Sequence, residues 1–120
     1  MAINVTESAG GKIIEVQVSG KLMHDDYADF VPRVEKRIKE LGKVRVLFDM
    51  VDFHGWDASA LWDEVKFDVK HFSDVERFAV VGDKQWEKTL TALSHPFTAA
   101  QVRYFERPQI DTARAWLAAP

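Results

Sequence analysis

The sequence predicts an α/β fold with a largely parallel sheet, and three observations support this prediction. Residues 44–50 form a nearly continuous apolar run of strand length, which is typical of a strand covered on both faces. Residues 77–82 form a second such run. Apolar residues between and around these runs recur at helical spacing. Strands that alternate with helices indicate parallel strands joined by right-handed crossovers.

The composition narrows the class of protein. A chain of 120 residues is long enough to bury its own core, so we expect one domain spanning residues 1–120. The net charge of −3, from 16 Lys and Arg against 19 Asp and Glu, gives no attraction to nucleic acid. The chain has no cysteine, which excludes disulfides and Cys-ligated metals. The N-terminal residues show neither the basic region nor the long apolar run of a signal peptide, and no segment reaches membrane-spanning length. We therefore expect a cytoplasmic protein.

The N-terminal residues predict a β-hairpin. Residues 3–6 and 14–18 alternate apolar and polar side chains, and the intervening residues 7–11 contain two glycines suited to a tight reversal. The alternation places Ile14, Val16 and Val18 on the inward face. Gly20 is expected to end the second strand.

A helix is expected next. Asp25 or Asp26 can cap it by accepting a hydrogen bond from a free backbone N–H, and Gly42 is a natural C-terminal cap. Pro32 interrupts this pattern and predicts a kink or a late helix start. The apolar residues at helical spacing are Tyr27, Phe30, Val31, Val34, Ile38 and Leu41.

The second half of the chain alternates helices and strands. A helix is expected after the central strand, with Ala58, Leu61, Trp62, Val65, Val69 and Phe72 on one face. After the strand at 77–82, the spacing of Trp86, Leu90 and Leu93 predicts a third helix that ends before Pro96. Residues 100–105 predict an edge strand, and a short last helix can pack through Ile110, Ala113, Trp116 and Leu117. The predicted order is ββαβαβαβα.

Several short sequences, taken in this order, resemble the SpoIIAA-like proteins, a branch of the STAS fold (sulfate transporter and anti-sigma-factor antagonist). The resemblance runs along nearly the whole chain and implies a mixed five-stranded sheet flanked by helices. It also implies a module that binds small ligands, lipids or proteins and has no established enzymatic activity. The residues that carry it are Asp26, Tyr27, Pro32, 43–47, 53–56, 60–62, Asp68, 79–83, Trp86 and 113–117.

The leading functional hypothesis is a site for an apolar or amphipathic small ligand or lipid. Ligands of open α/β sheets usually bind where the parallel strands end, and aromatic residues in a surface loop indicate a contact surface. The expected site is lined by Phe53, His54, Trp56, Trp62 and Trp86, with Asp49, Asp57 or His54 available to a polar head group. Trp62 and Trp86 also fit a purely structural role in the core. Trp56 and Phe67 fit peripheral membrane contact or a homodimer interface equally well.

The alternative hypothesis is a protein–protein regulator switched by phosphorylation at Ser59. Anti-sigma-factor antagonists carry an aspartate at a strand end and an Asp-Ser-Ser-Gly sequence at the next helix start, where a partner kinase modifies the second serine. Asp49 and Asp57 have the matching spacing, and Ser59 takes the place of that serine. Ala58 and Ala60 depart from the pattern. Asp57 is equally well explained as a helix cap.

No catalytic or metal site is predicted. Acidic residues, His54 and Ser59 gather at one expected rim of the sheet, which allows a hydrolase-like arrangement to be drawn. The sequence has no Gly-x-Ser-x-Gly elbow and no pair of histidines at the spacing of a metal-binding helix. We therefore expect a non-enzymatic protein without catalytic residues, metal or cofactor.

Overall fold

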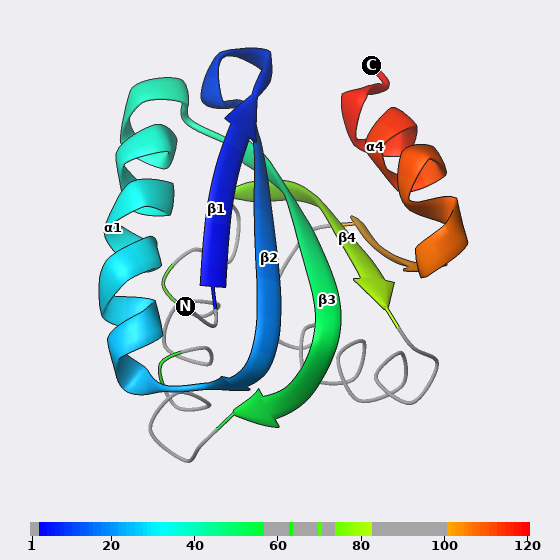
Figure 1. Ribbon diagram of the computed structural model, residues 1–120. Helices are drawn as coiled ribbons and strands as arrows, with labels where there is room; N and C mark the ends of the chain where they lie inside the picture. Colours follow the sequence, from blue (N-terminus) through cyan, green and yellow to red (C-terminus); the bar gives the residue numbers. More distant parts are fainter. Residues whose placement is uncertain (1–2, 57–62, 64–69, 71–73, 83–100) are drawn as a thin grey trace.

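The structure is a computed structural model that describes residues 3–56, 63, 70, 74–82 and 101–120. It contains a mixed five-stranded sheet in which the strands lie side by side in the order β1-β2-β3-β4-β5 (Figure 1). The antiparallel pair is β1 with β2, and every other adjacent pair is parallel. The predicted sheet is therefore confirmed. The strands are β1 (Ile3–Ser8), β2 (Ile13–Leu22), β3 (Val44–Trp56), β4 (Val75–Gly82) and β5 (Gln101–Glu106).

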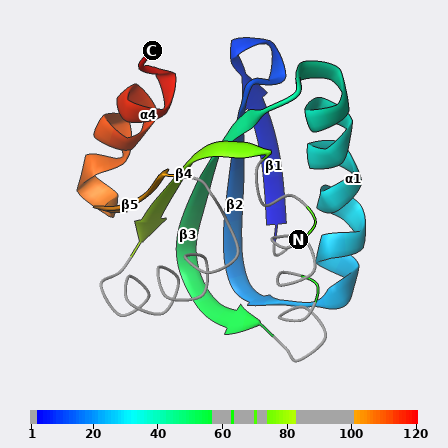
Figure 2. The ribbon, with the colours of Figure 1, turned by 180° about the vertical axis from the view of Figure 1, so that it is seen from behind.

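In the described part of the chain, two helices flank this sheet on opposite sides, as the front and back views show (Figures 1 and 2). Helix α1 (His24–Leu41) connects β2 to β3, and α4 (Ile110–Ala118) follows β5 after a short 3-10 turn, Arg107–Gln109. The helices expected between β3 and β4 and between β4 and β5 lie outside the described residues, apart from Asp63 and Lys70. Each described element has its predicted type and place in the order.

Strand β3 is the centre of the sheet, paired with β2 on one edge and β4 on the other. Its side chains alternate between two apolar clusters, which explains the continuous apolar run in the sequence. Val44, Val46, Phe48 and Met50 join the cluster beneath α1, whereas Leu47 joins the cluster beneath α4. The second cluster is completed by Ala79, Val81, Phe105, Ala113 and Leu117.

The N-terminal hairpin forms as predicted, but its second strand is longer than expected. Gly10 and Gly11 adopt positive φ angles of 68° and 92° in the turn, a conformation that glycine reaches without steric cost. Ile14, Val16 and Val18 are buried, as expected. The prediction that Gly20 ends the strand is wrong, because β2 continues to Leu22. Gly20 instead takes a φ of 61° at a register shift between β2 and β3, which marks a bulge.

Helix α1 begins earlier than the sequence suggested. Asp25 and Asp26 lie in its first turn and are not the N-cap residue. The carboxylate of Asp26 nevertheless accepts a hydrogen bond of 2.8 Å from the backbone N–H of Met23, which anchors the helix start. The helix passes through Pro32 as one element, so a late start is excluded. Gly42 caps the other end, where its N–H bonds to the Ile38 carbonyl at 2.7 Å.

The apolar face of α1 is largely as predicted, with one correction. Tyr27, Phe30 and Val34 are buried, and Val31 and Ile38 pack partly against the same cluster. Leu41, assigned to this face from its spacing, is 44% exposed because it lies in the last turn, next to the cap. Within the described ranges, no helix combines the length and apolar character needed to cross a bilayer.

Two arginines fasten the C-terminal end of α4 to the sheet. Arg45 and Arg77 are opposite each other on β3 and β4. Arg45 donates to the carbonyls of Leu117 and Ala119 at 2.6 and 2.5 Å. Arg77 donates to the Trp116 and Ala119 carbonyls at 2.7 Å each. Helix C-termini carry partial negative charge, so the carbonyls offset the repulsion between two adjacent guanidinium groups.

Glu76 provides the carboxylate of this cluster. It lies 3.0 Å from Arg45 and 3.3 Å from Lys12. The hydrogen bond from Arg45 is the largest effect and holds the pKa of Glu76 below its ordinary value. Burial opposes it, and the hydrogen bond and charge of Lys12 add to the lowering. A carboxyl with a lowered folded-state pKa stabilises the protein above its unfolded pKa and loses this contribution as pH falls through the folded one.

We predict that Glu76→Gln lowers the free energy of unfolding at pH 7 by about 0.5–1 kcal/mol, the usual size for a partly exposed ion pair. The difference between wild type and variant should shrink as pH falls below the ordinary carboxyl pKa and be lost as pH falls further through the lowered folded-state pKa, because protonated Glu76 no longer attracts Arg45. Urea denaturation at several pH values measures it. The control Asp52→Asn changes a carboxylate that is 89% exposed and should leave the stability profile unchanged. A pH-independent difference for Glu76→Gln would contradict this account.

Candidate ligand-binding site

The residues after the central apolar run were expected to form a loop, and this prediction is wrong. Residues 51–56 continue β3 as far as Trp56, where they still pair with β2. Asp52 and Gly55 adopt positive φ angles of 53° and 100°, close to register shifts in the pairing. The segment therefore bends without leaving the sheet. Its polar residues and glycine made it look like a loop in the sequence.

This extension changes the position of two residues from the expected site. Phe53 is 4% exposed and packs edge to face against Phe48, with ring centroids 5.9 Å apart. Phe53 therefore belongs to the core beneath α1 and presents no surface. His54 projects outward with 66% of its side chain exposed, and its Nε2 lies 3.6 Å from a carboxylate oxygen of Asp52.

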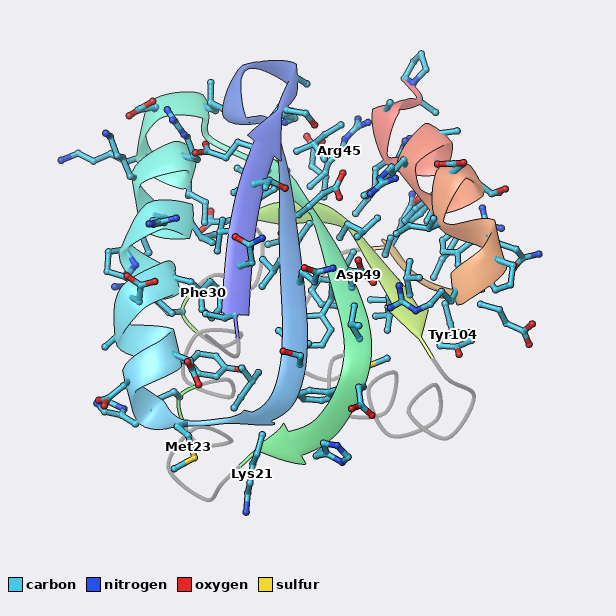
Figure 3. All side chains as sticks on the ribbon, viewed as in Figure 1. Lys21, Met23, Phe30, Arg45, Asp49 and Tyr104 are labelled. Atoms are coloured by element: carbon cyan, nitrogen blue, oxygen red, sulfur yellow. The ribbon has the colours of Figure 1, made fainter. Side chains whose placement is uncertain are left out.

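Asp49 also has a different environment from the one expected. It lies within β3 rather than at its end, on the side facing α4, and is 6% exposed (Figure 3). Its carboxylate accepts a hydrogen bond of 2.6 Å from Arg107, which also donates to the Met50 carbonyl. A buried carboxylate needs such a partner. Asp49 thus ties β3 to the turn that begins α4.

The other predicted site residues are not tested by these contacts. Trp56 ends β3, but its side chain lies outside the described part of the structure. Asp57, Ser59, Trp62 and Trp86 fall outside the described residues altogether. The aromatic rim and the phosphorylation of Ser59 therefore remain predictions.

The structure instead contains a pocket of about 350 Å³ beside α1. One wall is the first three turns of α1, and the other includes Asp63 and Lys70 from the segment that follows β3. The middle of the helix wall is mainly apolar. The lining residues are His24, Tyr27, Ala28, Val31, Pro32, Glu35, Asp63 and Lys70.

An ion pair lies at each end of this pocket. Nδ1 of His24 is 2.5 Å from Oδ2 of Asp63, and Nζ of Lys70 is 2.7 Å from Oε2 of Glu35. His24 and Glu35 are eleven residues apart on α1, a distance of roughly 16 Å along a helix. The two pairs therefore bridge the same two chain segments at opposite ends of an elongated space.

The base of the pocket is held in place by the core. Tyr27 lines the pocket but is only 2% exposed, and its ring lies 5.1 Å from that of Phe30. Phe30 points from α1 toward the sheet (Figure 3). Because the same turns of α1 cover the sheet and line the pocket, the helix wall has a fixed position.

The chemistry of the lining favours binding over catalysis. An apolar wall between charged ends suits a ligand with both apolar and polar parts.

Two further hollows in the described residues have different linings. One, of about 450 Å³, lies between β1 and α1 and includes Asn4, Asp29 and Arg33, and the other, of about 180 Å³, includes Asp49 and Arg114. No group of three or more His, Asp or Glu side chains suited to a metal ion occurs among the residues described.

Comparison with known proteins agrees with the fold and sheet order. The sequence matches the SpoIIAA-like family over residues 13–118. The chain belongs to the SpoIIAA-like family. Its structure is similar to the crystal structure of an uncharacterized protein of the DUF3478 family with a SpoIIAA-like fold from Shewanella loihica PV-4. The TM-score is 0.79 at 25% sequence identity, over 98% of this chain and 93% of the other. No functionally curated protein matches the sequence.

Membership of the SpoIIAA-like family establishes a STAS-type module but assigns no ligand. The α1 pocket was not predicted from the sequence of this protein. The one sequence feature that could have pointed to the pocket is Pro32, which interrupts the helical pattern and is one of the lining residues. The pairing of His24 with Asp63 and of Glu35 with Lys70 joins residues more than thirty positions apart, and no local pattern reveals it.

We predict that Phe53→Ala lowers the free energy of unfolding by about 3–5 kcal/mol, as expected when a buried phenylalanine leaves a cavity. His54→Ala, the matched change at the adjacent exposed position, should alter it by no more than about 0.5 kcal/mol. Urea denaturation of both variants measures the contrast. Similar small effects at both positions would show that Phe53 lies at the surface, as the sequence first suggested.

Proposed function

We propose that this SpoIIAA-like protein is a non-enzymatic binding module that takes an amphipathic small molecule or lipid into the α1 pocket. The observation that supports this proposal is an elongated apolar space of about 350 Å³ with an ion pair at each end. Ligand sites are commonly about 300–1,000 Å³ and combine apolar walls with a few fixed polar groups. The pocket replaces the rim of aromatic residues as the proposed binding site.

The apolar part of the ligand would lie against Ala28, Val31 and the ring of Pro32, which line the pocket. Burying this surface favours binding, because apolar groups gain free energy when they leave water. The ion pairs His24–Asp63 and Glu35–Lys70 keep the two walls at a fixed separation. They also offer donors and acceptors to a polar head group at either end, which favours amphipathic over purely apolar molecules.

We predict that Val31→Trp abolishes binding, because Val31 is partly buried against the core and a bulky ring at this position fills the pocket. Lys36→Trp is the matched control, since Lys36 is exposed on the same helix and does not line the pocket. Native mass spectrometry of protein purified from its own cells should show a bound apolar molecule with wild type and Lys36→Trp. Occupancy with Val31→Trp should fall at least about tenfold relative to both.

Equal occupancy in the Val31→Trp and Lys36→Trp proteins would overturn the assignment of the ligand to this pocket. A wild-type protein that carries no molecule and acquires none from a lipid extract of the same cells would overturn the binding function itself. Far-ultraviolet circular dichroism of both variants checks that the overall helix content is unchanged.

A further inference from the structure

The wall of the α1 pocket contains a backbone carbonyl without its usual helical partner. In an α-helix, the carbonyl of residue 28 accepts a hydrogen bond from the N–H of residue 32. Residue 32 is proline and has no N–H, so this bond cannot form. Ala28 and Pro32 both line the pocket. A carbonyl without its helical donor therefore belongs to a residue that lines the pocket.

The position of this acceptor is central. Helix carbonyls point along the axis toward the C-terminus, so the carbonyl of Ala28 is directed toward Pro32. Ala28 is one turn after His24, and Pro32 is nearly one turn before Glu35. The acceptor therefore lies between the two ion pairs, beside the apolar residues Tyr27 and Val31. Water can satisfy it in the empty pocket, but an apolar ligand covering it would leave it unpaired.

We propose that the Ala28 carbonyl determines the specificity of the pocket and that the ligand donates a hydrogen bond to it from an O–H or N–H group. This inference rests on the proposed binding function. A molecule with a donor next to its apolar part replaces the water without loss. A molecule of the same size without a donor displaces the water and leaves the carbonyl without a hydrogen bond, so it binds less tightly.

Other acceptors in the pocket can be distinguished from this one. The carboxylates of Asp63 and Glu35 also accept hydrogen bonds, but they lie at the ends and are engaged by His24 and Lys70. Their capacity does not depend on the residue at position 32. A variant that restores the missing N–H therefore tests the Ala28 carbonyl alone.

The experiment compares 1-decanol with decyl methyl ether, which keeps the oxygen and loses the donor. Isothermal titration calorimetry measures both ligands against wild type, Pro32→Ala and Pro32→Gly. Wild type should bind the alcohol about tenfold more tightly than the ether, the effect of one hydrogen bond. In both variants the N–H of residue 32 donates to the Ala28 carbonyl, so the affinities for the alcohol and the ether should become about equal.

The paired variants control for other effects of the substitution. Alanine and glycine differ widely in helix propensity, so a change common to both does not come from propensity. Loss of the proline ring weakens contact with the alcohol and the ether alike, and the ratio of their affinities is therefore insensitive to it. Replacing proline inside a helix also favours folding.

Two results would overturn the inference in distinguishable ways. Binding of both ligands without a preference in wild type, or with a preference that persists in both variants, would exclude the Ala28 carbonyl and leave the binding function intact. Failure of wild type to bind either ligand would overturn the inference, and the native mass spectrometry described above then decides separately whether the binding function stands.

Discussion

The double burial of β3 is the constraint on which the rest of the structure depends. Over residues 44–50, where the strand is paired on both edges and covered on both faces, its polar side chains have little access to water and need partners within the protein. Arg45 finds the last carbonyls of α4, and Asp49 finds Arg107 at the start of the same helix. The polar residues of the central strand thereby fix both ends of α4, while its apolar residues hold α1 and α4 on opposite faces.

The position of α1 follows from the same strand and creates the pocket. Tyr27, Phe30 and Val34 pack onto the cluster that contains Val46 and Phe48, which fixes the rotation of the helix about its axis. That rotation turns Ala28 and Pro32 away from the sheet and toward the segment carrying Asp63 and Lys70. The pocket therefore needs no element of its own. It lies between a core helix and the side chains of Asp63 and Lys70.

Much of the fold could be predicted from the sequence because its signals are local. The apolar run at 44–50 indicated the central strand, and the alternation in β2 correctly assigned Ile14, Val16 and Val18 to the inside. The extension of β3 was missed because Asp52 and Gly55 resemble loop residues, whereas positive φ angles at these positions allow the strand to bend. The true N-cap was missed because Asp26 anchors the helix from within its first turn.

The candidate site was harder to predict because it depends on contacts between distant residues. From the sequence alone, an aromatic residue after an apolar strand can lie at the surface or in the core. For Phe53, the packing against Phe48 shows that it lies in the core. Asp49 looked available to a ligand until its contact with Arg107, 58 residues later in the chain, was known. Pro32 was recognised as an anomaly in the helix, but its link to a pocket required the position of Asp63 and Lys70.

The most direct test of the account is to locate the ligand site by NMR during titration with 1-decanol. Methyl groups report on the two faces separately, since Ala28 and Val31 line the α1 pocket while Ala113 and Leu117 lie in the α4 cluster. The account predicts saturable shifts at Ala28 and Val31 with little change at Ala113 and Leu117. Shifts confined to the α4 side, or none at any of the four, would contradict it.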